Sequence, residues 1–251
     1  MQLPPGPWAT ALEFLLAHFR EISESTWRAR IERGLVLRED GSALHLLTPY
    51  RSGETLHYYR ELEAETPIPF EAQILRLDEH LLIADKPHFL PVMPAGRFVQ
   101  ESLLVRLKQA TGLEDLVPLH RIDRGTAGLV AFSINPQTRG AYQQLFPRRE
   151  VLKQYEALAP APLGLDFPIT RRSRIEPGEP FFRMCETDGT ANSETLIEVA
   201  ERRGEWDLYR LFPVTGRKHQ LRVHLAALGA PILHDPLYPL LLPEAEDDYA
   251  R

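Results

Sequence analysis

The chain has 251 residues, 43% of them hydrophobic and 9% aromatic, enough for a sizeable core in one medium-sized domain or in a larger domain with a small appendage. The single cysteine, Cys185, excludes an internal disulfide and a multi-cysteine zinc site, and it fits a reducing compartment. The net charge of -6 argues against a strongly basic protein that binds nucleic acid indiscriminately. No apolar run approaches the roughly 18 residues of a membrane span, so we expect a soluble cytoplasmic protein without membrane contact.

Two helices are predicted near the N-terminus. In residues 9–20, apolar side chains recur at the spacing of one helix face. A serine, Ser23 or Ser25, is positioned to cap a second helix, and Gly34 stands where a helix commonly ends.

A hairpin is predicted after these helices. Residues 35–39 and 43–47 resemble short strands, and an Asp-Gly-Ser turn lies between them. Prolines in residues 63–72 then indicate a linker. We therefore predict two domains, a small module over residues 1–65 and a larger domain over residues 70–251.

The larger domain consists of short apolar runs separated by turns. Strands are predicted over residues 74–77, 81–87, 128–134, 155–160, 195–201 and 206–214. Helices are predicted over residues 99–112, 135–146 and 217–229. Because strands and helices do not alternate regularly, this pattern favours an α+β domain with a mixed or antiparallel sheet.

The segment HRIDRGTAG, residues 120–128, places Asp123 between Arg121 and Arg124 in a glycine-containing loop. Nearby positive charge favours the ionised carboxylate. An ionised aspartate here can be a salt-bridge partner that pins the loop, a general base or a nucleophile. The segment alone leaves these roles open.

Basic residues gather in clusters although the chain is acidic overall. The clusters are Arg121 and Arg124; Arg148, Arg149 and Lys153; Arg171, Arg172 and Arg174; and Arg217, Lys218 and Arg222. If they converge in the fold, they can present a positive groove to phosphates. Each cluster taken singly is equally explained as a solvated face.

Polar side chains open the predicted helix near residue 220. They are Arg217, His219, Gln220, Arg222 and His224. A polar helix start ahead of an apolar body suggests a site, and the planar guanidinium of Arg217 can grip a carboxylate in a fixed direction. Tyr155 lies in a predicted strand among leucines, where a tyrosine is commonly a core residue.

Four segments together carry a resemblance to a known family. They are ADKPHFLPVMP (84–94), HRIDRGTAGLVAFS (120–133), KQYEAL (153–158) and TGRKHQLRVHLAALGAPILHDPLY (215–238). In this order they resemble the RluA-type family of pseudouridine synthases, and the resemblance covers roughly residues 73–240. Residues 1–65 are similar, more loosely, to the small RNA-binding module often found ahead of such domains.

The resemblance implies that a uridine within RNA is isomerised: the base is detached from its ribose, rotated and reattached through a ring carbon. It implies that Asp123 is the nucleophile and Arg217 its salt-bridge partner. Tyr155 is implied to stack under the base and to remove a proton late in the reaction. Arg121 is implied to help open the RNA helix and occupy the place of the flipped base.

The resemblance also bears on substrate and partners. Residues expected on the substrate-binding side are Arg121, Arg124, Lys86, His219, Gln220 and Arg222, with Lys86 and Arg222 as phosphate or structural contacts. We expect structured ribosomal or transfer RNA as the partner, no cofactor, no metal ion, and a monomer. The acidic balance favours a structured local target read by a limited positive groove.

Departures from the family pattern are Ala127, where serine is common, and His234, where glycine is common. The chain ends with the segment DPLYPLLLPEAEDDYAR (235–251), whereas relatives usually continue through another strand or two, so we expect either a truncated sequence or a missing last strand. Three alternatives remain. One is a catalytically silent RNA-binding protein on the same scaffold, and another is an enzyme of free uridine derivatives. The third is a hydrolase that combines Asp123 with one of three histidines, His120, His219 or His224.

Overall fold

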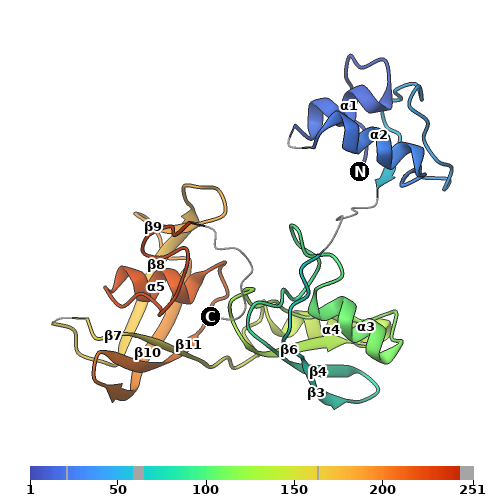
Figure 1. Ribbon diagram of the computed structural model, residues 1–251. Helices are drawn as coiled ribbons and strands as arrows, with labels where there is room; N and C mark the ends of the chain where they lie inside the picture. Colours follow the sequence, from blue (N-terminus) through green and yellow to red (C-terminus); the bar gives the residue numbers. More distant parts are fainter. Residues whose placement is uncertain (21, 59–64, 163, 244–251) are drawn as a thin grey trace. The chain divides into compact units, whose positions relative to one another are not determined.

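The computed structural model describes residues 1–20, 22–58, 65–162 and 164–243. The chain divides into two compact units, Met1–Ala64 and Glu65–Arg251 (Figure 1). Both combine short helices with antiparallel strands, which confirms the predicted α+β class. No helix within the described ranges is long and apolar enough to cross a membrane.

The first unit contains the two predicted helices, α1 (Ala11–His18) and α2 (Glu24–Glu32). The side chains of Thr10 and Ser23 cap them, because each hydroxyl accepts a hydrogen bond from a backbone N–H of the first turn. Gly34 follows α2 with φ of 70°, a left-handed conformation that glycine adopts without steric cost. The helices pack through a common apolar core of Leu12, Phe14, Leu15, Trp27 and Ile31.

The predicted hairpin forms only in part. Strand β1 (Val36–Arg38) pairs with β2 (Leu56–Tyr58), and residues 43–47 contribute a single bridge, from Ala43. The reason is a turn at the next residues, where the hydroxyl of Thr48 accepts a hydrogen bond from the backbone of His45. The prediction of a second strand at 43–47 was therefore wrong.

The predicted linker is partly built into the second unit; its residues 63 and 64 lie outside the described part of the chain. The carboxylate of Glu65 accepts hydrogen bonds from the backbone N–H groups of residues 99–101. Ile68 is buried, and the guanidinium of Arg106 donates to the carbonyls of Ile68 and Phe70. Residues 65–72 are therefore an ordered entry to the second unit rather than a linker.

The second unit begins with a four-stranded antiparallel sheet in the order β3-β4-β6-β5. Its strands are β3 (Gln73–Leu77), β4 (Leu81–Lys86), β5 (Val117–Pro118) and β6 (Gly128–Ser133). Helices α3 (Leu103–Thr111) and α4 (Pro136–Leu145) lie beside it (Figure 1). Alternate residues of the central strands, such as Leu82 and Val130, are fully buried in this core.

A five-stranded antiparallel sheet follows in the order β7-β11-β10-β8-β9. Its strands are β7 (Tyr155–Pro160), β8 (Ile169–Pro177), β9 (Met184–Thr187), β10 (Ser193–Arg203) and β11 (Trp206–Pro213). Helix α5 (Gln220–Ala227) packs against β9 and β10. The six predicted strands of the larger domain are all confirmed.

Strand β8 escaped prediction because arginines replace the usual apolar alternation. Cross-strand ion pairs accompany it instead, from Arg171 to Glu186 and from Arg172 to Glu194. A pattern read only for apolar residues cannot detect such a strand.

Candidate active site

Asp123 lies in the loop between β5 and β6, where its backbone carbonyl accepts a hydrogen bond from Thr126. Three contacts join this loop to the segment that follows β4: Lys86 Nζ to the Arg124 carbonyl at 3.2 Å, His88 Nδ1 to the Gly125 carbonyl at 2.7 Å, and Arg124 Nε to the Phe89 carbonyl at 3.0 Å. The loop is thus held beside the end of β4, and the Asp123 side chain remains 37% exposed.

Arg222, in the first turn of α5, is the ion-pair partner of Asp123. Its Nη1 donates to Asp123 Oδ2 at 2.8 Å, while Nε and Nη2 donate to the two oxygens of Asp235 at 2.6 and 2.7 Å. The Arg222 and Asp235 side chains are only 16% and 3% exposed. The bidentate contact therefore fixes the direction of the guanidinium and leaves Nη1 for Asp123.

The guanidinium of Arg222 stays protonated. Burial lowers its pKa, but hydrogen bonds and charges from Asp235 and Asp123 outweigh that effect, so the pKa lies above its ordinary value. A permanent cation thus faces the carboxylate of Asp123.

Arg217 does not make the salt bridge that the sequence predicted. It lies in the exposed loop before α5, where its Nε donates to the Asn192 carbonyl at 3.1 Å. The two arginines are five positions apart, and only the start of α5 at Gln220 decides which one faces Asp123. The partner is Arg222, held in place by Asp235.

His219 stands beside the same carboxylate, with Nε2 3.9 Å from Asp123 Oδ2. Its Nδ1 lies 2.8 Å from the hydroxyl of Tyr238. Burial lowers the pKa of His219 to about 4, against the opposing effect of Asp123, so the imidazole is neutral at neutral pH. Within the described chain, His219 is a neutral neighbour of Asp123 rather than a second cation.

Tyr155 is the first residue of β7 and packs against the core of the second sheet. Burial, and next the negative charge of Asp123, raise the pKa of Tyr155. The charge effect means that the phenol lies within electrostatic range of the carboxylate, and the raised pKa keeps it protonated at neutral pH. Tyr155 and Asp123 are 32 positions apart in the sequence (155 minus 123), yet the fold places them close enough for the charge of Asp123 to act on the phenol.

The side chains of Arg121 and Arg124 have different environments although both residues flank Asp123. The Arg121 side chain is exposed, whereas the Arg124 guanidinium lies over the ring of Phe98, 4.5 Å from its centroid. Arg121 is therefore accessible to solvent, whereas Arg124 braces the loop.

Lys86, predicted to contact substrate, is fully buried. Its Nζ donates to three carbonyls, those of Pro87, Leu90 and Arg124. Burial lowers the pKa of Lys86 to about 8, although Asp123 opposes the shift. The ammonium therefore uses its donors inside the protein, which favours the structural contact over the phosphate contact, the two alternatives expected for Lys86.

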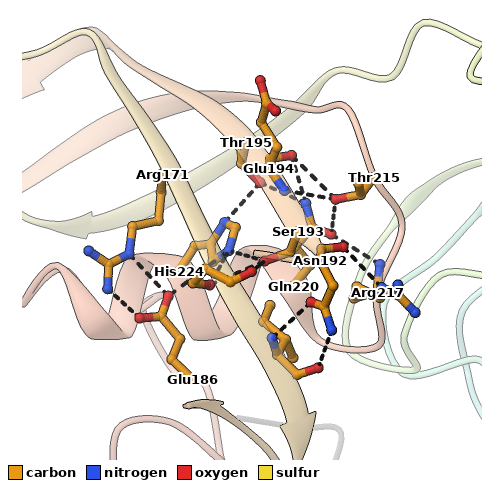
Figure 2. A network of polar contacts seen from close by, with 12 residues as sticks. Arg171, Glu186, Asn192, Ser193, Glu194, Thr195, Thr215, Arg217, Gln220 and His224 are labelled. Atoms are coloured by element: carbon orange, nitrogen blue, oxygen red, sulfur yellow. Dashed lines mark hydrogen bonds and ion pairs between the residues drawn. The ribbon is translucent and has the colours of Figure 1, made fainter. Parts of the chain in front are cut away.

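Gln220 is also buried and fully engaged (Figure 2). Its Oε1 accepts from Thr215 Oγ1 and the Arg217 backbone, and its Nε2 donates to the Glu194 carbonyl and Thr195 Oγ1. All its hydrogen-bonding groups have protein partners. Gln220 thus fastens the loop before α5 to β10, which favours a structural role over the expected substrate contact.

His224 continues this network one turn further along α5 (Figure 2). Its Nδ1 lies 3.0 Å from Thr195 Oγ1, and its Nε2 lies 2.9 Å from Ser193 Oγ and 3.1 Å from Ser173 Oγ. The imidazole is fully buried, and burial lowers its pKa to about 4. Neutral His224 therefore anchors the helix that carries Arg222.

The histidines do not support a hydrolase. His120 Nε2 accepts a hydrogen bond from the Ala131 backbone at 3.1 Å, and the imidazole of His224 is enclosed in its own network. Among the described residues, no group of three or more histidine, cysteine, aspartate or glutamate side chains is placed to hold a metal ion. Only His219 approaches Asp123.

Two residues of the site were missed, Asp235 and Tyr238. Both lie in the segment 215–238, but an aspartate before a proline is also typical of an ordinary turn. Asp235 does cap such a turn, because its Oδ1 accepts from the backbone of Leu237 and Tyr238. No local signal distinguishes that role from its grip on Arg222.

Lys86→Met is expected to lower the free energy of unfolding by about 2 kcal/mol, because it leaves buried carbonyls without donors. Tritium release from RNA labelled at uridine C5, a measure of uridine isomerisation, should slow because the Asp123 loop loses a brace. RNA affinity and its salt dependence should stay unchanged, as fluorescence anisotropy at several salt concentrations can check. A salt slope reduced by about one would instead mean that Lys86 contacts a phosphate.

Acid is expected to destabilise the second unit through His224. Its pKa is near 6.5 in an unfolded chain and about 4 in the fold, so stability is full above pH 6.5 and falls as the pH drops toward 4. The loss should reach about 3 kcal/mol at pH 4, with Glu186 and Arg171 as the charged groups nearest the ring. Urea unfolding of His224→Gln should show a flatter pH dependence. His45→Gln, at an exposed histidine, should behave as wild type, and an unchanged slope in His224→Gln would refute the assignment.

Comparison with known proteins identifies the family of the chain. The family model for RNA pseudouridylate synthase matches residues 80–227. Dual-specificity RNA pseudouridine synthase RluA of Vibrio parahaemolyticus is 33% identical over 195 residues, which cover 73% of each chain. Ribosomal large subunit pseudouridine synthase D of Xanthomonas campestris is 31% identical over 244 residues, covering 92% of this chain and 72% of the relative.

A longer relative and a solved structure also match. The mitochondrial tRNA pseudouridine(32) synthase of Saccharomyces cerevisiae is 29% identical over 237 residues, covering 90% of this chain but only 50% of the yeast protein. The structure of human RNA Pseudouridylate Synthase Domain Containing 4 superposes with a TM-score of 0.54 at 27% identity, covering 70% of this chain and 73% of that one. The candidate site centres on Asp123, a partly exposed aspartate that is paired with the largely buried Arg222. The chain belongs to the RluA-type family of RNA pseudouridine synthases.

Proposed function

We propose that the chain isomerises specific uridines in structured ribosomal or transfer RNA to pseudouridine, with Asp123 as the nucleophile. The observation that carries the proposal is the contact of Asp123 with Arg222 at 2.8 Å, on a carboxylate that stays accessible. A fixed cation orients the carboxylate without covering it.

The carboxylate of Asp123 attacks C1′ of the ribose, and the C1′–N1 bond breaks with its electron pair on the uracil. The detached uracil then turns, and its C5 attacks C1′ and displaces the Asp123 carboxylate. The hydrogen at C5 leaves to solvent as a proton, and N1 takes up a proton from solvent. Arg222 takes the positioning role first predicted for Arg217.

Tyr155 faces the same site from β7, where its ring can stack under the uracil. Its raised pKa favours stacking and orientation over the role of a base, because a phenolate is scarce at neutral pH. Arg121 is the exposed arginine of the loop and is suited to occupy the space that a flipped base leaves. Arg217 and Lys218, exposed in the loop before α5, are suited to contact phosphates.

The small first unit, which follows the helix-helix-strand order of the resembled module, would supply a further RNA contact. We propose that the protein acts as a monomer in the cytoplasm, without a cofactor or metal ion. The second candidate function, a catalytically silent RNA-binding protein, would use the same surfaces.

Tritium release separates the two functions. Transfer RNA and ribosomal RNA, taken from cells that lack the protein and labelled with tritium at C5 of uridine, would be incubated separately with the purified chain. Release that saturates at one or a few tritium atoms per RNA molecule is expected from one pool. Binding without release in both pools, by a protein shown to be folded, would support the silent alternative.

A further inference from the structure

Two aromatic side chains stand exposed at the tip of the β8–β9 hairpin. Phe181 is 85% exposed and Phe182 is 37% exposed, and their ring centroids lie 5.4 Å apart in an edge-to-face arrangement. Single exposed apolar residues are common on protein surfaces, but adjacent rings on a projecting turn form an apolar patch that favours contact with another molecule.

The tip has a defined conformation. Residues Pro177 and Met184 close the strand pairing, the Gly178 backbone N–H donates to the Arg183 carbonyl at 3.1 Å, and the Arg183 N–H donates to the Pro180 carbonyl at 2.8 Å. These contacts hold the turn on both sides of the phenylalanines. The rings are thus presented by an ordered turn, which reduces the entropy lost when a ligand stacks on them.

The hairpin is joined to the catalytic carboxylate through Tyr238. The Met184 backbone N–H donates to the Tyr238 hydroxyl at 2.7 Å, that hydroxyl lies 2.8 Å from His219 Nδ1, and His219 Nε2 lies 3.9 Å from Asp123. The guanidinium groups of Arg183 and Arg222 each lie 5.1 Å from the centroid of the Tyr238 ring. Tyr238 therefore contacts both the hairpin, at Met184, and the two residues next to Asp123, His219 and Arg222.

The chemistry of the proposed reaction indicates which ligand would contact the two phenylalanine rings. A uridine inside a stem must leave the stack before Asp123 can reach it, and its neighbours then lose a stacking partner. Aromatic side chains stack on such bases with little regard to sequence. Met184 at the base of the hairpin is linked through Tyr238 and His219 to Asp123, so the hairpin is continuous with the site that would receive the RNA.

Resting on the proposed function, we propose that Phe181 and Phe182 form a stacking platform for unpaired bases that adjoin the target uridine. Phe181, the more exposed ring, supplies most of the contact. Such a platform holds the RNA in its opened form without selecting a particular base.

Phe181→Ala tests the platform in steady-state tritium release from the responsive RNA pool. The half-saturating RNA concentration should rise about tenfold, the size expected for one lost stacking contact, while the rate at saturation changes less than about threefold. Phe181→Trp should keep the wild-type concentration because it preserves the ring. Leu77→Ala, at an exposed apolar residue of β3, controls for the loss of surface apolar area and should also match wild type.

A direct binding measurement makes the test independent of catalysis. A single-stranded RNA oligonucleotide containing 2-aminopurine should lose fluorescence on binding the wild-type chain, because stacking quenches the probe, and Phe181→Ala should weaken both quenching and affinity. Equal affinity and quenching in wild type and Phe181→Ala would overturn the platform. If wild type releases no tritium while Phe181→Ala still weakens quenching and affinity, the platform stands and the proposed isomerisation fails.

Discussion

Asp123→Asn is expected to abolish tritium release from RNA, with a rate loss of about four orders of magnitude or more, the scale of removing a nucleophile. Asparagine has nearly the same shape, but its amide is neutral and does not attack carbon. The fold should survive because the Arg222 guanidinium keeps its two hydrogen bonds to Asp235. Single-turnover release measures the loss, and circular dichroism with RNA-binding anisotropy checks that folding and affinity remain.

Asp115→Asn is the matched control, because it makes the same chemical change at an exposed aspartate of the same unit. It should release tritium at the wild-type rate. Activity retained in Asp123→Asn would disprove the nucleophile assignment. Loss of both activity and the folded state would be resolved by Asp123→Glu, which keeps the charge but displaces the carboxylate and should fold while reacting slowly.

Arg222→Met should destabilise the second unit by about 3 to 5 kcal/mol, because it leaves the buried carboxylate of Asp235 without a counter-charge. It should also remove activity, since Asp123 loses the guanidinium whose Nη1 lies 2.8 Å from its Oδ2. Urea unfolding gives the stability change. Arg222→Lys should recover little of either property, because an ammonium cannot serve both carboxylates with the same geometry.

Stability and activity can be separated by a double variant. Adding Asp235→Asn to Arg222→Met removes the unpaired buried charge, so much of the lost stability should return while activity stays absent. Arg217→Met provides the contrast, because its exposed side chain contacts only the Asn192 carbonyl and its loss should cost under about 1 kcal/mol. If Arg217→Met removed activity as fully as Arg222→Met, with RNA affinity unchanged, the orienting role would return to Arg217.

Local features of the sequence predicted local structure well. Ser23 caps α2 and Gly34 follows it, because capping depends on residues within one turn. The apolar strands of the second unit were likewise predicted, because a short apolar run between turns identifies a strand without knowledge of the strand that pairs with it. Strand β8 and the pairing of β1 with β2 were missed, because one has charged alternation and the other joins segments about 20 residues apart.

The sequence by itself determined the family, since four ordered segments carry that information in residue identity alone, and it singled out Asp123 as the candidate nucleophile. The tertiary structure decided which polar side chains serve the site. In the structure, Arg222 and not Arg217 contacts Asp123, and Asp235 holds the guanidinium of Arg222 in place. Lys86 and Gln220 are buried and form hydrogen bonds within the protein. The physical reason is that direction and burial of a side chain depend on residues far away in the chain: Asp123 and Arg222 are 99 positions apart, and no local pattern reports such a contact.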